Sequence, residues 1–248
     1  MTGVIATRAQ FGLILPSTNT SVEAEFARML VDGVSWHSAR IYIPNPELDD
    51  DESFVAFLEG LRTEIGRAVR DVVTANVDYL VMGMSAETFW GGKDGAAQFA
   101  TDMAELSGGL GVTTGAVAVD EALKKYGARR IGVITPYQPV GDRQVRDFLQ
   151  QTGYDVVAMH GLKCSSATSI ADVTADELRA AFEQVNGPDV DALLQVGTNL
   201  ACAKVAAEVE RELHKPVIAI NTATVWHAYR VNGITDRIDG FGSLLSEF

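Results

Sequence analysis

The stretch VDYLVMGMSAETFWGG, residues 77 to 92, starts as a buried strand and then turns abruptly polar. Its apolar run from 79 to 82 is followed at once by Gly83, Met84 and Ser85. In a parallel α/β sheet, ligands bind at the carboxyl ends of the strands, where these small and polar residues would lie. An ordinary strand-to-helix turn would have the same appearance, so a binding site is favoured only if the stretch has a counterpart elsewhere.

A counterpart occurs in the second half of the chain, where VDALLQVGT at 190 to 198 matches VDYLVMGMS at 77 to 85 (190 − 77 = 113). The match sets up three pairs of equivalent positions: Gly83 and Val196, Met84 and Gly197, and Ser85 and Thr198. Two further pairs of segments repeat in the same order: QFGLILP at 10 to 16 with RIGVITP at 130 to 136, and GVTTG at 111 to 115 with PVIAINT at 216 to 222. Three matched segments in one order predict a duplicated βαβ unit.

The repeat predicts an α/β fold of two lobes related by a pseudo-two-fold axis, each a parallel four-stranded sheet flanked by helices. We expect lobe one to comprise residues 1–116 and 222–248, and lobe two to comprise residues 117–221. The two matched strand ends would then face each other across an active-site cleft between the lobes.

Two helices of lobe one can be placed from local signals. Apolar residues spaced by three and four predict a helix over 52–75. Thr20 and Glu23 have the spacing of a capping box, which predicts a second helix that starts there and runs to about Leu30.

The net charge restricts the partners of the chain. Its 248 residues carry 33 acidic and 20 basic side chains, for a net charge of −13, whereas a nucleic-acid partner requires a basic surface. A small carboxylic acid remains possible as substrate, because backbone N–H groups, hydroxyls and helix N-termini can hold a carboxylate without a cation. Assembly into a homo-oligomer is also possible.

The location of the protein is suggested by what the sequence lacks. There is no apolar run of about 18 residues and no long apolar segment at the N-terminus, so neither a membrane partner nor a signal peptide is expected. The two cysteines, Cys164 and Cys202, have neither metal-ligand nor disulfide-framework spacing. These features favour a reducing cytoplasm.

Four short motifs at the ends of strands together resemble a known family. They are PSTNT at 16 to 20, MGMS at 82 to 85, TPY at 135 to 137 and VGT at 196 to 198. Their order and spacing are similar to those of the aspartate/glutamate racemase superfamily, and within it to the branch of the maleate cis–trans isomerases and arylmalonate decarboxylases. The resemblance extends from about Phe11 to Leu245 and implies the same two-lobed fold.

The resemblance also implies a dioxyanion hole, a set of donors that holds a substrate carboxylate. The positions that would bind substrate are Pro16, Asn19, Gly83, Met84, Val196 and Gly197, and the catalytic hydroxyls would be those of Ser85, Tyr137 and Thr198. Donors fixed around the carboxylate oxygens would stabilise the negative charge of an enediolate, each by about 3 kcal/mol. The alternative is that Ser85 and Thr198 only cap helices and that Tyr137 only packs.

One departure from the family pattern concerns the thiols. Racemases and maleate isomerases of this type carry a cysteine at each of the positions of Gly83 and Val196, and arylmalonate decarboxylases keep the second. This chain has neither. We interpret Cys164 and Cys202, which fall in other segments, as buried structural thiols.

Glu87 and His227 are the remaining candidates for proton transfer. Glu87 follows Ser85 by two residues and could act as an acid or base, although an acidic residue in the first turn of a helix is also stabilised by the helix dipole. His227 could transfer a proton near neutral pH, or it could be a partly exposed helical residue. No metal is expected, because no cluster has ligand spacing, and no nucleotide cofactor is expected, because GGLG at 108 to 111 precedes a strand.

Together these features predict a cofactor-independent enzyme that acts on a small mono- or dicarboxylic acid through an enediolate-like intermediate. The leading hypothesis is a decarboxylase-like lyase, because loss of CO₂ needs mainly a carboxylate clamp and an apolar pocket for the departing group. The alternatives are a maleate-type cis–trans isomerase with another nucleophile, a racemase or hydrolase, and a degenerate protein that only binds a carboxylate.

Overall fold

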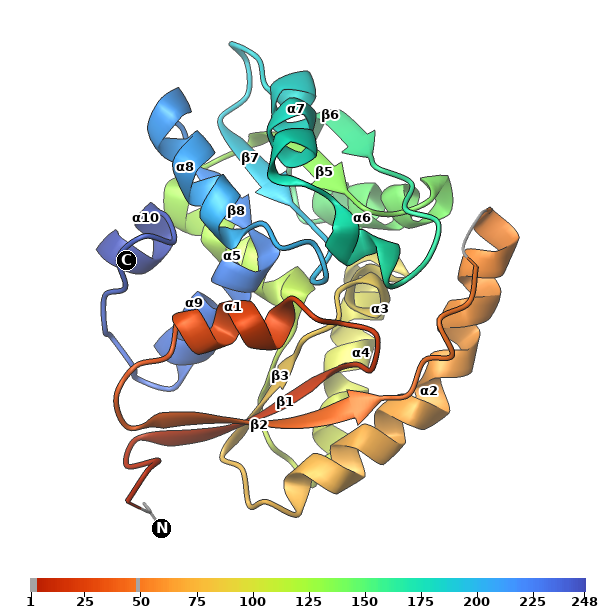
Figure 1. The fold of residues 1–248 in the computed structure, drawn as a ribbon, viewed down its shortest axis with the longest axis vertical. Coiled ribbons are helices and arrows are strands. Elements are labelled where there is room, and N and C mark those ends of the chain that lie inside the picture. The colour runs from red at the N-terminus through yellow and green to blue at the C-terminus, as the bar shows by residue number, and fades with distance from the viewer. Residues whose placement is uncertain (1–3, 48–49) are drawn as a thin grey trace.

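Two parallel four-stranded sheets form the framework of the molecule. The computed structural model describes residues 4–47 and 50–248. The strands of the first sheet are β1 (Ala9–Pro16), β2 (Val34–Ile41), β3 (Tyr79–Met82) and β4 (Val112–Thr113), and those of the second are β5 (Arg130–Thr135), β6 (Asp155–Gly161), β7 (Ala192–Gln195) and β8 (Val217–Ala219). Their orders, β2-β1-β3-β4 and β6-β5-β7-β8, are equivalent, and Figure 1 shows the two sheets one above the other. The predicted fold of two four-stranded parallel sheets is therefore confirmed.

The register of the strands shows that the repeat is structural as well as sequential. In the first sheet Gly12 pairs with Leu80, and in the second Gly132 pairs with Leu193. The sequence match relates the same positions, because 12 + 120 = 132 and 80 + 113 = 193. Matched strands of the two lobes therefore pair in the same register and end at equivalent positions in their sheets.

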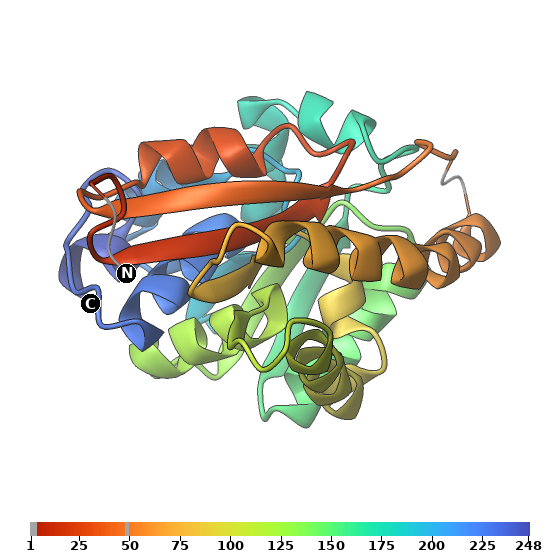
Figure 2. The ribbon, with the colours of Figure 1, turned by 90° about the horizontal axis from the view of Figure 1, so that it is seen from below.

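Helices flank the sheets in both lobes. They are α1 (Val22–Arg28), α2 (Asp51–Val73), α3 (Ala86–Phe89), α4 (Gly92–Leu106), α5 (Gly115–Tyr126), α6 (Pro139–Gln151), the 3₁₀ helix η1 (Ser169–Asp172), α7 (Ala175–Val185), α8 (Ala203–Leu213), α9 (Ile220–Val231) and α10 (Ser243–Glu247). Figures 1 and 2 both show α2 running beside the first sheet, with its first turns projecting beyond the body of the molecule. No helix in residues 4–47 and 50–248 has the length and apolar character that a membrane crossing requires.

Two helices carry the chain between the sheets. α5 leaves the first sheet after β4 and leads to the second, and α9 leaves the second sheet after β8 and returns to the first. The two helices pack along each other. The expected lobe boundaries, 116/117 and 221/222, fall in the first turns of α5 and α9 and remain a prediction.

The return of α9 completes the core of the first lobe. The Tyr229 ring of α9 lies 6.0 Å from that of Phe11 and 5.9 Å from that of Trp36, and Phe11 and Trp36 stack at 4.8 Å. The Tyr229 hydroxyl donates to the carbonyl of Met29 at 3.0 Å. A residue from the end of the chain thus closes a cluster built on the first two strands.

The start of α1 differs from the sequence prediction. The helix begins at Val22, and the Asn19 side-chain carbonyl accepts from the N–H groups of Ser21 at 3.0 Å and Val22 at 2.9 Å. The expected capping box of Thr20 and Glu23 is wrong, because the amide of Asn19 already occupies the first free N–H groups. Glu23 forms an ion pair with Arg40 instead.

Candidate active site

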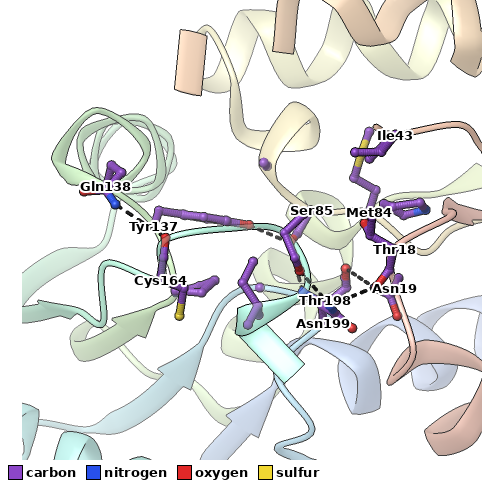
Figure 3. A pocket seen from close by; sticks show the side chains of 16 residues that line it. Thr18, Asn19, Ile43, Met84, Ser85, Tyr137, Gln138, Cys164, Thr198 and Asn199 are labelled. Carbon is purple, nitrogen blue, oxygen red and sulfur yellow. Dashed lines mark hydrogen bonds between the residues drawn. The ribbon is translucent and has the colours of Figure 1, made fainter. Parts of the chain in front are cut away.

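A cavity of about 70 Å³ lies where the strand ends of the two sheets meet. The segments that follow β1, β2, β3, β5 and β7 contribute to it, together with the chain from the end of β6 into η1. Its lining consists of Pro16, Thr18, Asn19, Ile43, Met84, Ser85, Ala86, Pro136, Tyr137, Gln138, Cys164, Ala167, Ile170, Gly197, Thr198 and Asn199. The cavity therefore draws on both lobes, and Figure 3 shows it from close by.

Three hydroxyl groups meet in this cavity. Ser85 follows β3, Tyr137 follows β5 and Thr198 follows β7, and all three are buried. The Ser85 and Tyr137 hydroxyl oxygens are 2.7 Å apart, and the Thr198 N–H donates to Ser85 Oγ at 3.2 Å. Figure 3 shows the three side chains in a row. We call this group the hydroxyl cradle.

The backbone around Gly197 brings Thr198 into the hydroxyl cradle. Gly197 has a φ of +111°, a conformation that favours glycine. A Cβ atom at this position would lie 2.4 Å from Cδ of Pro136, so the ring packs directly on the glycine. The tight turn lets the Thr198 hydroxyl reach across to lobe one, where it donates to the Gly83 carbonyl at 3.0 Å.

Two asparagines and an arginine support the cradle. Asn19 Nδ2 donates to Thr198 Oγ1 at 3.3 Å. Asn199 Oδ1 accepts from Thr20 N–H at 3.0 Å, and its Nδ2 donates to the Ala167 carbonyl at 2.9 Å. Arg40 donates to the Asn19 carbonyl at 3.1 Å. The amide of Asn19 is thus shared between the cap of α1 and the cradle, and Asn199 joins three segments around the cavity.

The cavity has no charged side chain among its lining residues. Burial raises the pKa of Tyr137 well above its ordinary value, and the hydrogen bond with Ser85 lowers it by less. The tyrosine hydroxyl is therefore protonated at neutral pH and can act as a donor. A bound carboxylate would be held by hydroxyl, amide and backbone groups rather than by a cation.

Much of the remaining lining is apolar. Ile43, Met84, Ala167 and Ile170 form what we call the apolar wall. In Figure 3, Ile43 and Met84 lie at the Asn19 end of the hydroxyl cradle, opposite the end where Cys164 lies. Sequence reasoning missed Ile43, Ala167 and Ile170, because these positions lie outside the repeated strand-end motifs and carry no chemical signal.

Cys164 is the main surprise in the lining. The sequence interpretation of Cys164 as a buried structural thiol is wrong, because this residue is only partly buried and lines the cavity. The Cys164 N–H donates to the Pro136 carbonyl at 2.9 Å, which fixes its segment beside the end of β5. Burial raises the pKa of the Cys164 thiol to about 11. Cys202 is completely buried at the start of α8, as expected of a structural thiol, and burial raises its pKa as well.

The thiols should therefore be unreactive at neutral pH. At pH 7 we expect iodoacetamide to alkylate Cys164 at least about 100-fold more slowly than free cysteine, with a tenfold rise per pH unit up to pH 10, because only the thiolate reacts. Cys202 should stay unlabelled while the protein is folded. Intact-mass spectrometry over time measures both, with Cys164→Ser to identify the site. Rapid alkylation of Cys164 at pH 7 would contradict the protonated thiol.

Two of the residues predicted to be catalytic lie outside this cavity. Glu87 of α3 lines a separate cavity with Trp90 and Met103. His227 of α9 faces β4, where its Nδ1 is 2.8 Å from Thr113 Oγ1, and burial lowers its pKa. Neither residue is among those that line the cavity, so a catalytic role for them stays a prediction without support from this geometry.

The predicted substrate-binding residues divide into two groups. Pro16, Asn19, Met84 and Gly197 line the cavity. Gly83 and Val196 are buried behind the lining, and a Cβ atom at Gly83 would lie 3.0 Å from Cβ of Leu15. Within residues 4–47 and 50–248, no group of three or more His, Cys, Asp or Glu side chains could hold a metal ion.

Comparisons with known proteins agree on one family. A family model described as arylmalonate decarboxylase matches residues 11–245. A maleate isomerase from Nocardia farcinica is 24% identical over 96% of this chain and 96% of its own length. An arylmalonate decarboxylase from Bordetella bronchiseptica is 30% identical over 67% of this chain and 70% of its own length.

Solved structures show the same fold. A mutant of the Nocardia farcinica maleate cis–trans isomerase with a covalently bound succinylcysteine intermediate has a TM-score of 0.87 and 23% identity, over 97% of this chain and 99% of its own. A double mutant of arylmalonate decarboxylase in the liganded form has a TM-score of 0.82 and 24% identity, over 97% of this chain and 100% of its own. The two-lobed architecture is therefore shared over nearly the whole chain.

Proposed function

The chain belongs to the arylmalonate decarboxylase family, and from this premise we propose that it is a cofactor-independent decarboxylase of a small malonate-type acid. One observation carries the proposal: a cradle of three hydroxyls stands beside an apolar wall in a cavity without charged lining residues. Such a cavity suits a reaction that begins with a carboxylate and releases neutral CO₂.

The hydroxyl cradle would hold the carboxylate that the product keeps. Ser85 and Tyr137 would be the donors, and Thr198 would hold them in place, because its N–H donates to Ser85 Oγ and its hydroxyl donates to the Gly83 carbonyl. When the bond between the α-carbon and the second carboxylate breaks, its electron pair passes to the α-carbon and on to the retained carboxylate, and CO₂ leaves. The resulting enediolate carries more negative charge on its oxygens than the substrate did, so the donors stabilise it more strongly.

The apolar wall would face the departing carboxylate. An ion beside Ile43, Met84 and Ile170 cannot be hydrated as it is in water, whereas CO₂ is neutral and loses little there. The apolar wall would therefore destabilise the bound substrate relative to the enediolate and CO₂. The same surface would accept a substituent on the α-carbon.

The reaction ends with a proton added to the α-carbon. The two sequence-predicted donors, Glu87 and His227, lie elsewhere. The cavity offers the hydroxyl of Tyr137 and the thiol of Cys164, and the raised pKa of each keeps its proton in place at neutral pH. Cys164 is therefore suited to donate a proton and poorly suited to attack a carbon atom.

The proposal is tested by incubating the purified protein with a panel of α-substituted malonates. We expect release of one CO₂ per substrate and, in D₂O, one deuterium on the α-carbon of the product. Coupled CO₂ detection and ¹H NMR measure these quantities. The Tyr137→Phe variant separates catalysis in this cavity from a contaminating activity. If no malonate in the panel loses CO₂ above the buffer rate, the decarboxylase proposal fails.

A second candidate is cis–trans isomerisation of a maleate-like diacid. It is favoured by maleate isomerases that match this chain over nearly their whole length. It is disfavoured by the absence of thiols at 83 and 196 and by the protonated state of Cys164. Conversion of maleate to fumarate, followed by ¹H NMR, would replace the first proposal. Thermal stabilisation by carboxylates without either reaction would indicate a carboxylate-binding protein.

A further inference from the structure

A buried carboxylate lies behind the hydroxyl cradle. Glu25 of α1 is only 8% exposed and points toward lobe two. Its Oε1 accepts from the N–H of Ala203, the first residue of α8, at 2.8 Å. Its Oε2 accepts from Nδ2 of Asn221 on α9 at 2.7 Å. One side chain thus joins three helices.

Asn221 extends this network to the cradle. Its Nδ2 also donates to the Thr198 carbonyl at 2.9 Å, so both protons of the amide nitrogen are used. If the amide were turned over, its oxygen would face two acceptors, the Glu25 carboxylate and the Thr198 carbonyl. Glu25 therefore determines which way the amide of Asn221 points, and this orientation anchors Thr198.

Both oxygens of Glu25 are engaged, one with the first N–H of α8 and the other with Asn221. Burial raises the pKa of Glu25, because a charge is unfavourable away from water. The hydrogen bonds from Asn221 and Ala203 lower the pKa by less. The neighbouring thiol of Cys202 is neutral, and the nearest basic influence is Arg28 of the same helix, whose charge lowers the pKa of Glu25 by less than the two hydrogen bonds do. A buried polar group of this kind costs stability unless all its partners are in place.

We propose that Glu25 is a positioning residue for the hydroxyl cradle, acting through Asn221 on Thr198. The Thr198 carbonyl, N–H and hydroxyl are held by Asn221, Ser85 and Gly83 respectively. Loss of the hydrogen bond from Asn221 to the Thr198 carbonyl would loosen the turn at Gly197. The contacts of Thr198 with Ser85 and Gly83 would then be displaced. The inference rests on the proposed function only in assigning the cradle to the retained carboxylate.

The informative variant is Glu25→Gln, which keeps the shape of the side chain. A glutamine can accept from Ala203 but offers N–H to Asn221, so two donors confront each other. The Asn221 amide relieves this by turning over, and it then presents oxygen to the Thr198 carbonyl. Glu210→Gln is the matched control, because Glu210 also accepts through both oxygens, from Ser243 Oγ at 2.6 Å and Ser243 N–H at 2.9 Å, away from the cavity.

We expect Glu25→Gln to lower kcat for the malonate substrate about 100-fold with KM changed less than about threefold, because the cradle acts mainly on the enediolate. The Thr198 amide signal in a ¹H–¹⁵N NMR spectrum should shift in Glu25→Gln and stay in place in Glu210→Gln. Asn221→Ala should have a similar effect, and the double variant should be no worse than the poorer single variant, because both act through one contact.

The outcomes separate this inference from the decarboxylase proposal. If the wild-type protein releases no CO₂, the decarboxylase proposal fails, and the Thr198 amide signal alone then tests the positioning role. An unshifted Thr198 signal in folded Glu25→Gln, or additive losses in the double variant, would overturn the role of Glu25. If Glu25→Gln does not fold, Glu25→Asp tests the same contact by shortening the side chain, and an unshifted Thr198 signal in folded Glu25→Asp would likewise overturn the role of Glu25.

Discussion

Replacing Tyr137 with phenylalanine is expected to lower kcat for CO₂ release about 100- to 1000-fold, the usual effect of removing one donor to a developing oxyanion. Ser85→Ala should have an effect of similar size, since its hydroxyl lies 2.7 Å from that of Tyr137. The double variant should lose less than the product of the two factors, because the two hydroxyls act as a unit. Steady-state kinetics with the best malonate of the panel measures all three.

The chain contains a matched control for this pair. Tyr126 and Ser243 also have hydroxyl oxygens 2.7 Å apart, but they lie outside the cavity. Tyr126→Phe and Ser243→Ala should keep kcat within about twofold of the wild type. Equal losses in the two pairs would mean that the effect comes from the fold, and the hydroxyl cradle would lose its catalytic assignment.

The second large effect is expected from Gly197→Ala. The positive φ of +111° costs a residue with a side chain about 1–3 kcal/mol. The new methyl group would also lie 2.4 Å from Pro136 Cδ, so the ring and the turn that carries Thr198 must separate. We expect the free energy of unfolding to fall by about 3 kcal/mol or more, measured by urea denaturation, together with loss of CO₂ release.

Gly153→Ala isolates the part of this effect that comes from backbone strain. Gly153 has a φ of +103°, but no atom lies within 4 Å of the position of the added Cβ atom. Its replacement should therefore cost only the strain, and activity should be retained. If the two variants lose the same stability, the contact with Pro136 contributes nothing.

The repeat explains why the fold could be predicted well. A buried strand is a short run of apolar residues, and its end is marked by glycine, proline or a hydroxyl, so matched strands can be recognised locally. The parallel order then places equivalent ends at one edge of each sheet. The repeat pointed to Ser85 and Thr198, and the family resemblance added Tyr137 and Asn19, all four of which lie within three residues of the end of a strand.

The residues that were missed or misplaced depend on longer-range geometry. Cys164 and Ile170 enter the cavity because the chain after β6 folds over it, and no local pattern specifies that path. Glu87 lies two residues after Ser85, which is about 200° around a helix axis, so it faces away from the cavity. His227 is oriented by its partner Thr113, which is distant in sequence.

The position of Tyr229 in the first lobe has a consequence for the order in which the protein can fold during synthesis. The strands that carry Phe11 and Trp36 leave the ribosome early, but the ring that completes their cluster follows near the end of the chain. Contacts so distant in sequence form slowly, because a long loop must close first. The N-terminal lobe therefore cannot complete its core until the C-terminal lobe has been synthesised, and part of its apolar surface stays exposed until then.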